Sequence, residues 1–199
     1  MKKVVHCFDL DGTVIDSFHR VAECLDINGN LDLNKYRSVA CQHDKIMQDS
    51  FLPLYHLMVD LLNKGEKVVI CTARMMNKSD YFFLRKAGLK RVCFIASRDR
   101  LGKWFAPDTA KAVYSLSDAD YKRHWLEYMK GLFLGYDFIV YDDHKGVLSM
   151  AESLGYKTVD ANTANSVADT FFRLGFEMGV DDIVSDLEET VFINTGIEL

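Results

Sequence analysis

Two aspartates, Asp9 and Asp11, stand at the end of an apolar run near the start of the chain and are followed by Gly12 and Thr13. A short apolar run bounded by a glycine turn is typical of a buried β-strand, so both carboxylates emerge together where the strand ends. Two crowded carboxylates are unfavourable unless a cation or a shared proton relieves their repulsion. The pattern therefore predicts a reactive site, although Asp-Gly pairs also occur in ordinary turns.

Polar side chains follow two later apolar runs in the same way. Thr72 ends a second run, and Asp142 and Asp143 end a third. Ligands of open α/β sheets bind at the carboxyl ends of the strands. We therefore expect these side chains to gather with the first two aspartates at one edge of a sheet.

Strands and helices are predicted to alternate through the first 160 residues. The expected strands are 4–8, 68–71, 92–96, 138–141 and 157–159, and the expected helices are 51–64, 80–86, 118–130 and 145–154. Residues 97–117 show no such pattern and are expected to form a loop, and residues 16–49 are expected to form a small excursion over the site. The alternation predicts an α/β fold with a doubly wound, mainly parallel, Rossmann-like sheet.

Composition limits the class of protein. The chain has 199 residues with 49% hydrophobic content, which suits one globular domain, and its formal net charge is −5. No apolar stretch is long enough to span a membrane, so we expect no membrane partner. The five cysteines lack the close pairing of a metal site or a redox motif, which predicts reduced thiols and a cytoplasmic location.

Residues 161–199, here called the C-terminal extension, differ in composition from the rest. They contain one basic residue, Arg173, and eight acidic residues. An apolar stripe at helical spacing begins at Val167, and such a stripe must be buried. We expect residues 1–160 to form the main domain and the extension to be an acidic helical layer packed on it, with a homodimer contact as the alternative.

The motifs, taken in order, resemble the four motifs of the haloacid dehalogenase (HAD) superfamily of phosphohydrolases. They are Asp9-x-Asp11-Gly12-Thr13, Thr72, a lysine, and Asp142-Asp143. Each motif alone is weak, but four in the expected order, each at a strand end, make a strong signal. The resemblance covers residues 4 to about 160 and implies a HAD-type phosphatase, a phosphoric monoester hydrolase. The excursion is too short for a large cap domain, so little or no cap is expected.

The resemblance implies a role for each motif residue. Asp9 would be the nucleophile that becomes an aspartyl-phosphate, and Asp11 would be the general acid and then the general base. Thr72 would bind a phosphate oxygen. The implied substrate-binding residues are Gly12, Thr13, Ala73 and Arg74. The implied ligands of a Mg²⁺ cofactor are Asp9, the carbonyl of Asp11, Asp143 and, more weakly, Asp142.

The phosphate-binding lysine can be Lys122 or Lys111. Lys122 lies near the start of the expected helix 118–130, whose Trp125 and Leu126 can anchor it in the core, so its ammonium can be held in a fixed position. Lys111 lies in the segment expected to be a loop. We therefore place Lys122 in the catalytic set.

Other basic residues near the expected site admit two interpretations. Arg74 can reach a substrate phosphate with its planar fork, or it forms an ordinary surface ion pair. A track for a nucleic-acid backbone could be lined by five cations, with Trp104 or Phe105 available for stacking: Arg98, Arg100, Lys103, Lys122 and Arg123. The alternative is that these residues are ordinary solvated charges.

Within the superfamily, the pattern is similar to the 3′-phosphatase half of bacteriophage-type polynucleotide kinases. The similar features are Thr72-Ala73-Arg74, the charged loop 97–100 and Asp120-Tyr121-Lys122. The chain departs from that family because it has no Gly-x-x-x-x-Gly-Lys-Ser/Thr kinase motif. The expected substrate is a phosphorylated oligonucleotide with a 3′-phosphate, or a nucleoside monophosphate. A non-catalytic HAD-fold binding protein would lack the nucleophile, the lysine or the second acid, and none is missing.

Overall fold

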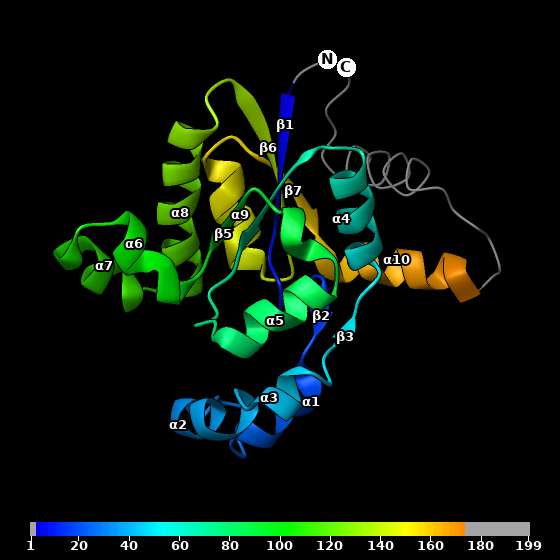
Figure 1. The fold of residues 1–199 in the computed structure, drawn as a ribbon, viewed down its shortest axis with the longest axis vertical. Helices are drawn as coiled ribbons and strands as arrows, with labels where there is room; N and C mark the ends of the chain where they lie inside the picture. Colours follow the sequence, from blue (N-terminus) through cyan, green and yellow to red (C-terminus); the bar gives the residue numbers. More distant parts are fainter. Residues whose placement is uncertain (1–2, 174–199) are drawn as a thin grey trace.

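Five parallel strands form the central sheet of the computed structural model, which describes residues 3–173 (Figure 1). The strands are β1 (Lys3–Phe8), β4 (Lys67–Cys71), β5 (Phe94–Ala96), β6 (Tyr136–Asp142) and β7 (Lys157–Asp160). Their order is β5-β4-β1-β6-β7, and every neighbouring pair is parallel. This confirms the predicted doubly wound sheet, and it places the end of β1 between the ends of β4 and β6.

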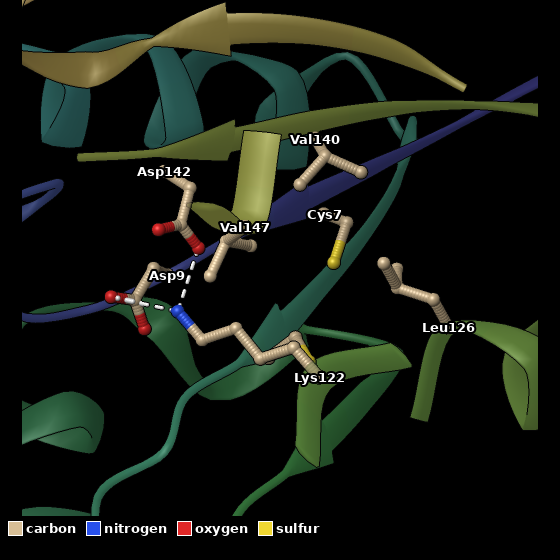
Figure 2. Close-up of a pocket in the computed structure, with 8 residues that line it drawn as sticks. Cys7, Asp9, Lys122, Leu126, Val140, Asp142 and Val147 are labelled. Carbon is tan, nitrogen blue, oxygen red and sulfur yellow. Dashed lines mark hydrogen bonds and ion pairs between the residues drawn. The ribbon is translucent and has the colours of Figure 1, made fainter. Parts of the chain in front are cut away.

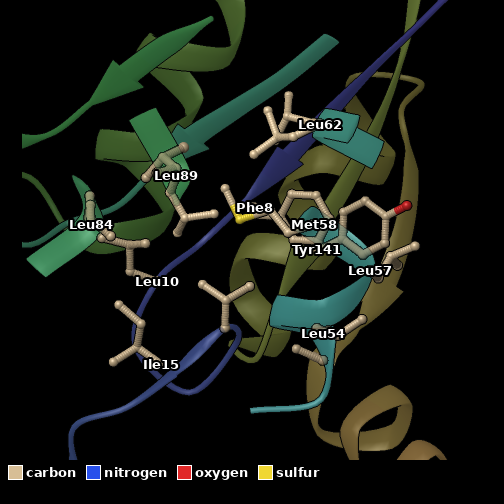
Figure 3. Packing of buried hydrophobic residues seen from close by; sticks show 14 of the residues in the cluster. Phe8, Leu10, Ile15, Leu54, Leu57, Met58, Leu62, Leu84, Leu89 and Tyr141 are labelled. Atoms are coloured by element: carbon tan, nitrogen blue, oxygen red, sulfur yellow. The ribbon is translucent and has the colours of Figure 1, made fainter. Parts of the chain in front are cut away.

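Helices cover both faces of this sheet (Figure 1). One face packs against α4 (Leu54–Asn63), α5 (Lys78–Lys86) and α10 (Ala161–Arg173), and the other against α7 (Pro107–Tyr114), α8 (Asp118–Leu132) and α9 (Lys145–Ser153). Successive strand residues point to opposite faces, so Phe8 joins the first core cluster and Cys7 the second. Figure 3 shows the first cluster, where Phe8 stacks on Tyr141 with ring centroids 4.1 Å apart.

Residues 97–117 are not the loop that the sequence predicted. They form a 3₁₀ turn (Arg98–Arg100), α6 (Leu101–Trp104) and α7, which has a proline in its first turn. The prediction was wrong because these helices are short and bury few side chains, mainly Leu101 and Val113, so the apolar pattern is too sparse to detect.

A small helical insertion leaves the sheet after β1 and returns before α4, at the carboxyl end of the strands (Figure 1). Its neck is the antiparallel pair β2 (Ile15–Asp16) and β3 (Ser50–Phe51). Between them lie short helical elements and connecting turns: α1 (Phe18–Val21), a 3₁₀ turn (Ala22–Cys24), α2 (Leu33–Lys35), a π turn (Tyr36–Ala40) and α3 (His43–Ile46). This matches the small excursion that the sequence predicted.

A buried ion pair holds the insertion together. Arg20 is 1% exposed, and its Nε and Nη2 donate to the two carboxylate oxygens of Asp49 at 2.7 and 2.9 Å. Its Nη1 donates to the carbonyl of Ala40. The insertion contains few buried apolar side chains, so this bidentate contact joins its first helix to the segment that returns to the sheet.

The first turns of α10 pack against the sheet. Ala161, Ala164 and Ala168 are buried, and the first two belong to the cluster around Phe8. The part of the apolar stripe that lies beyond residue 173, and any homodimer contact that it makes, fall outside the described residues. Between residues 3 and 173, no helix combines the length and apolarity that crossing a bilayer requires.

We predict that Arg20→Met lowers the free energy of unfolding by about 3 to 5 kcal/mol, because Asp49 would stay buried without its bidentate partner. Urea denaturation measures the loss. The double variant Arg20→Met/Asp49→Leu is the control, since it removes both charges and should recover much of the stability. A loss below about 1 kcal/mol for the single variant would mean that the pair behaves like an exposed one.

Candidate active site

The polar residues that end three neighbouring strands meet at one edge of the sheet, as the sequence predicted. Asp9 follows β1, Thr72 follows β4 and Asp142 ends β6. Lys122, from α8, reaches between two of them: its Nζ lies 3.1 Å from Asp9 Oδ2 and 2.6 Å from Asp142 Oδ2 (Figure 2). Lys111 is instead exposed on α7.

Apolar packing fixes the position of Lys122. Its neighbours on α8, Tyr121, Trp125 and Leu126, are buried, so the helix is anchored on both sides of the lysine. The lysine stem runs past Cys7 and Val147, and only the ammonium reaches the carboxylates (Figure 2). Because the stem of Lys122 is buried among apolar side chains, its ammonium is directed to the two carboxylates, Asp9 and Asp142.

Charge and burial act against each other in this cluster. Burial raises the pKa of Asp9 to about 8; Lys122 opposes this rise and Asp142 adds to it. Burial alone would lower the pKa of Lys122, but the adjacent Asp9 and Asp142 carboxylates outweigh it and raise that pKa well above its usual range. The acidic groups are thus incompletely neutralised by the lysine, and a further cation would stabilise them.

A third carboxylate completes a group that could hold a metal ion. One oxygen each from Asp9, Asp142 and Asp143 lies within 4.8 Å of the others. Asp142 already accepts from Lys122 and from the backbone N–H of His144, whereas the buried Oδ1 of Asp9 has no hydrogen-bond partner among the described residues. Burial, followed by the charge of Asp142, raises the pKa of Asp143. The donor set fits a hard divalent cation.

Asp11 lies in a different electrostatic setting from Asp9. Its carboxylate accepts from the Ser17 hydroxyl and from the guanidinium of Arg74, with Arg74 Nε 2.9 Å from Oδ2. Burial would raise the pKa of Asp11, but the charge and hydrogen bonds of Arg74 outweigh it and lower the pKa to about 2. Asp11 is therefore ionised in this arrangement. Protonation of Asp11 is therefore unfavourable while it is paired with Arg74.

Arg74 is not on the surface, so the interpretation as a surface ion pair is wrong. Its side chain is 3% exposed, and besides Asp11 it donates to Asp80 at 2.7 Å. It also lies 3.9 Å from Asp49, the partner of Arg20. The guanidinium can be buried because these three carboxylates neutralise its charge.

The sequence analysis missed several residues that position the site. Ser17 and Asp80 are buried partners of the ion pair that Arg74 forms, and Asp49 connects that pair to the insertion. Asp80 carries one detectable local signal, because it forms the capping box of α5 together with Asn77, three residues earlier. The pairing of these residues with Arg74 has no local signal.

The backbone at Gly12 lies close to the Asp143 carboxylate. Gly12 has a φ of +71°, and a Cβ built there would lie 2.5 Å from Oδ2 of Asp143. Thr13 and Thr72 are fully or almost fully buried, and the first of them follows Gly12 directly in the chain. Only glycine combines this backbone conformation with room for the neighbouring carboxylate.

The proposed track of basic residues is largely committed to internal contacts. Arg98 donates to the carbonyls of Ala73, Tyr114 and Leu116, pairs with Asp118, and lies over the ring of Tyr121 at 4.4 Å. Arg100 donates to the Tyr81 hydroxyl, and Lys122 is buried in the site. Three of the five cations therefore have structural partners. Arg98 in particular ties the segment after Thr72 to the start of α8.

The chain is similar in sequence to known proteins. The whole chain, residues 1–199, matches the family described as bacteriophage T5 5′-deoxynucleotidase. It is 44% identical over 200 residues to the 5′-deoxynucleotidase of Escherichia phage T5, a match that covers 98% of this chain and 82% of that protein.

The fold is also similar to solved structures. One is a haloacid dehalogenase-like hydrolase from Streptococcus pneumoniae, with a TM-score of 0.54, 14% identity and coverage of 79% of this chain and 83% of that one. Another belongs to the Pnkp1/Rnl/Hen1 RNA repair complex, with a TM-score of 0.51, 19% identity and coverage of 79% and 42%. At these identities the likeness confirms the predicted HAD-type fold alone.

We predict that Gly12→Ala lowers the free energy of unfolding by about 1 to 2 kcal/mol, because alanine is strained at this φ. The methyl group would also displace Asp143, so we expect the Mg²⁺ concentration needed for half-maximal activity to rise by about tenfold or more. Chemical denaturation and a metal titration measure the two effects.

Gly88→Ala is the matched control for this prediction. Gly88 has a φ of +80° and no atom within 4 Å of a built Cβ. It should lose similar stability while its Mg²⁺ dependence stays that of the wild type. Equal metal dependence in the two variants would show that the contact between Gly12 and Asp143 does not shape the site.

Proposed function

The chain belongs to the bacteriophage T5 5′-deoxynucleotidase family, and on this basis we propose that it is a Mg²⁺-dependent HAD-type phosphatase that hydrolyses nucleoside 5′-monophosphates through an aspartyl-phosphate on Asp9. The observation that carries the proposal is the contact of Lys122 with both Asp9 and Asp142 beside a third carboxylate. A fixed ammonium next to a buried carboxylate suits a reaction in which that carboxylate attacks a phosphoryl group whose oxygens carry negative charge.

In the first half of the reaction, Asp9 acts as the nucleophile. An oxygen of its carboxylate forms a bond to phosphorus while the bond from phosphorus to the ester oxygen breaks. Lys122 and Thr72 hold the phosphoryl oxygens, and the backbone amide of Ala73, the residue after Thr72, is a further donor. For the departing ester oxygen to take a proton from Asp11, Asp11 must first turn from Arg74 toward the substrate and take up a proton from solvent.

The second half regenerates the enzyme. A water molecule gives a proton to Asp11 and attacks phosphorus, and the bond between phosphorus and Asp9 breaks to release phosphate. The strong pairing of Asp11 with Arg74 favours its ionised form, which is the form that accepts this proton. Arg74 thus favours the form of Asp11 that acts as the base in this second half.

The metal assignment rests on the donor set. Asp9 and Asp143, together with the carbonyl of Asp11, would hold Mg²⁺, while Asp142 is occupied by Lys122 and by the amide of His144. When bound, Mg²⁺ would neutralise negative charge on the transferred phosphoryl group. The buried, unpartnered Oδ1 of Asp9 and the raised pKa of Asp143 both support a cation at this position.

Two observations favour a mononucleotide over a nucleic-acid end as the substrate. The relative that is 44% identical carries the name 5′-deoxynucleotidase, and its sequence matches nearly the whole of this chain. In addition, Arg98 and Arg100 are held by internal partners and are not free to line a nucleic-acid backbone. The 3′-phosphate of an oligonucleotide, which the sequence pattern suggested, becomes the competing substrate in the test below.

We predict that phosphate release is fastest with 2′-deoxynucleoside 5′-monophosphates. A panel should also contain ribonucleoside 5′-monophosphates, 3′-phosphorylated and 5′-phosphorylated oligonucleotides and sugar phosphates, each with Mg²⁺ and with a chelator. Asp9→Asn is the control, because its amide keeps the shape but is a poor nucleophile, and we expect no turnover from it.

Three outcomes of this panel would contradict the proposal. A kcat/KM at least tenfold higher for the 3′-phosphorylated oligonucleotide would establish the end-processing reaction instead. Full activity in the chelator would exclude the metal assignment. No phosphate release from any substrate by a folded protein would favour the non-catalytic binding protein.

The remaining expectations also form part of the proposal. We propose that residues 1–160 contain all the reacting groups, that the C-terminal extension packs on the same domain, and that the protein acts in the cytoplasm of a host cell. A homodimer through the extension is the alternative use of its apolar stripe. Size-exclusion chromatography with light scattering distinguishes a monomer from this dimer.

A further inference from the structure

Two asparagines of α10, Asn162 and Asn165, donate hydrogen bonds to the two loops that carry the metal-binding groups. We propose that they are positioning residues: they set the distance between the loop of Asp11 to Thr13 and the loop of Asp143, and thereby the affinity of the site for its metal ion. This inference rests on the proposed function, and it assigns part of the C-terminal extension to the catalytic unit.

Asn165 is 9% exposed and uses both ends of its amide. Its Nδ2 donates to the carbonyl of Thr13 at 3.0 Å, and its Oδ1 accepts from the backbone N–H of Leu54 at 2.8 Å. The N–H of Leu54 lies in the first turn of α4, where backbone donors have no partner within the helix. The residue before it, Pro53, makes no capping hydrogen bond, so Asn165 supplies that cap from a distant helix.

The two groups that Asn165 joins lie at the neck of the insertion. The chain leaves the sheet through Thr13 and β2 and returns through β3 to Leu54, and Leu52 donates to the carbonyl of Val14 across this neck. An amide that bonds to both the outgoing and the returning segment fixes the neck against the sheet. Asp11 lies two residues before Thr13, so its position follows that of the neck.

Asn162 makes the corresponding contact with the second loop. Its Nδ2 donates to the carbonyl of Asp143 at 3.0 Å. Residues three apart lie on the same side of a helix, so Asn162 and Asn165 act from one face of α10. Ala161 and Ala164, also on α10, are buried and small, so the helix can come close to the sheet.

The backbone at Gly12 lies against the side chain of Asp143. A single methyl group added to Gly12 would come within 2.5 Å of the Asp143 carboxylate. Metal sites tolerate only small changes in the separation of their ligands, and Mg²⁺ is the most demanding of the common cations. Since α10 donates a hydrogen bond to a carbonyl of each loop, it controls the separation of the metal ligands, on which Mg²⁺ binding depends.

The test uses the full-length chain and two variants. Asn165→Asp keeps the size of the side chain and the acceptor for Leu54, but it replaces the donor to Thr13 with a carboxylate oxygen that repels the carbonyl. Asn162→Ala removes one hydrogen bond from an exposed position and should not affect folding. We expect the Mg²⁺ concentration for half-maximal activity to rise by about tenfold in Asn165→Asp and by about threefold in Asn162→Ala, with kcat lowered more than KM is changed.

A second readout does not depend on turnover. Mg²⁺ binding to the folded protein raises its melting temperature increasingly as the Mg²⁺ concentration rises. A fit of this rise to the binding relation gives the Mg²⁺ concentration for half-saturation, which is the binding midpoint. It should shift in both variants by the same factors as the activity midpoint. A purely structural role would lower the melting temperature at every Mg²⁺ concentration and leave this midpoint unchanged.

Two controls separate positioning from general stability. Leu62→Ala, at the far end of α4, should lower the melting temperature without changing either midpoint. Ser166→Ala, on the exposed side of α10, should change neither property. If Asn165→Asp does not fold, Asn162→Ala alone decides the question.

The inference is overturned if the folded variants keep the wild-type midpoints, or if Leu62→Ala shifts them equally. That failure is distinct from failure of the proposed function. If only the inference fails, the wild-type protein hydrolyses its substrate with Mg²⁺ and the variants do so with the same Mg²⁺ dependence. If the proposed function fails, the wild-type protein itself shows neither Mg²⁺-dependent hydrolysis nor a Mg²⁺-dependent rise in melting temperature.

Discussion

The ammonium of Lys122, held between Asp9 and Asp142, is the interaction on which the rest of the site depends. Three acidic side chains gather at the edge of the sheet, and their repulsion would oppose folding if no cation stood among them. The apolar neighbours of Lys122 on α8 keep its charge in place, and Arg98 ties the start of that helix to the segment after Thr72. The charge of Lys122 thus has two roles. It allows the carboxylates to be buried, and in the proposed reaction it would bind the phosphoryl group.

A second charge cluster gives the insertion its connection to the site. Arg74 holds Asp11 and Asp80 and lies near Asp49, which in turn holds Arg20. The two carboxylates of the Asp9-x-Asp11 motif therefore face different cations. Asp9 shares Lys122 with Asp142 beside the position proposed for a metal ion, whereas Arg74 lowers the pKa of Asp11 beside the insertion. We infer that the same short motif supplies a nucleophile and a proton-transfer group because these surroundings differ.

Local sequence patterns predicted the parts of the site that depend on local structure. Apolar runs ending in polar residues located Asp9, Thr72 and Asp142, and the order of the strands then brought them together. Lys122 was accessible to the same reasoning because its helix carries an obvious apolar face. Contacts between residues far apart in the chain were not accessible: Arg20 with Asp49, Arg74 with Asp80 and Asn165 with Thr13 pair through tertiary structure. Helices 101–104 and 107–114 were missed because they bury too few apolar side chains.

The stereochemistry at phosphorus tests the central claim most directly. A 5′-phosphorothioate substrate made chiral with one heavy oxygen isotope would be hydrolysed in water labelled with a second heavy isotope. The configuration of the released thiophosphate, which carries sulfur and three different oxygen isotopes, would then be determined. Attack by Asp9 followed by attack of water comprises two displacements, each of which inverts the configuration at phosphorus. The account predicts net retention. Net inversion would mean that water attacks the substrate directly, and it would contradict the role of Asp9 as a nucleophile held beside Lys122.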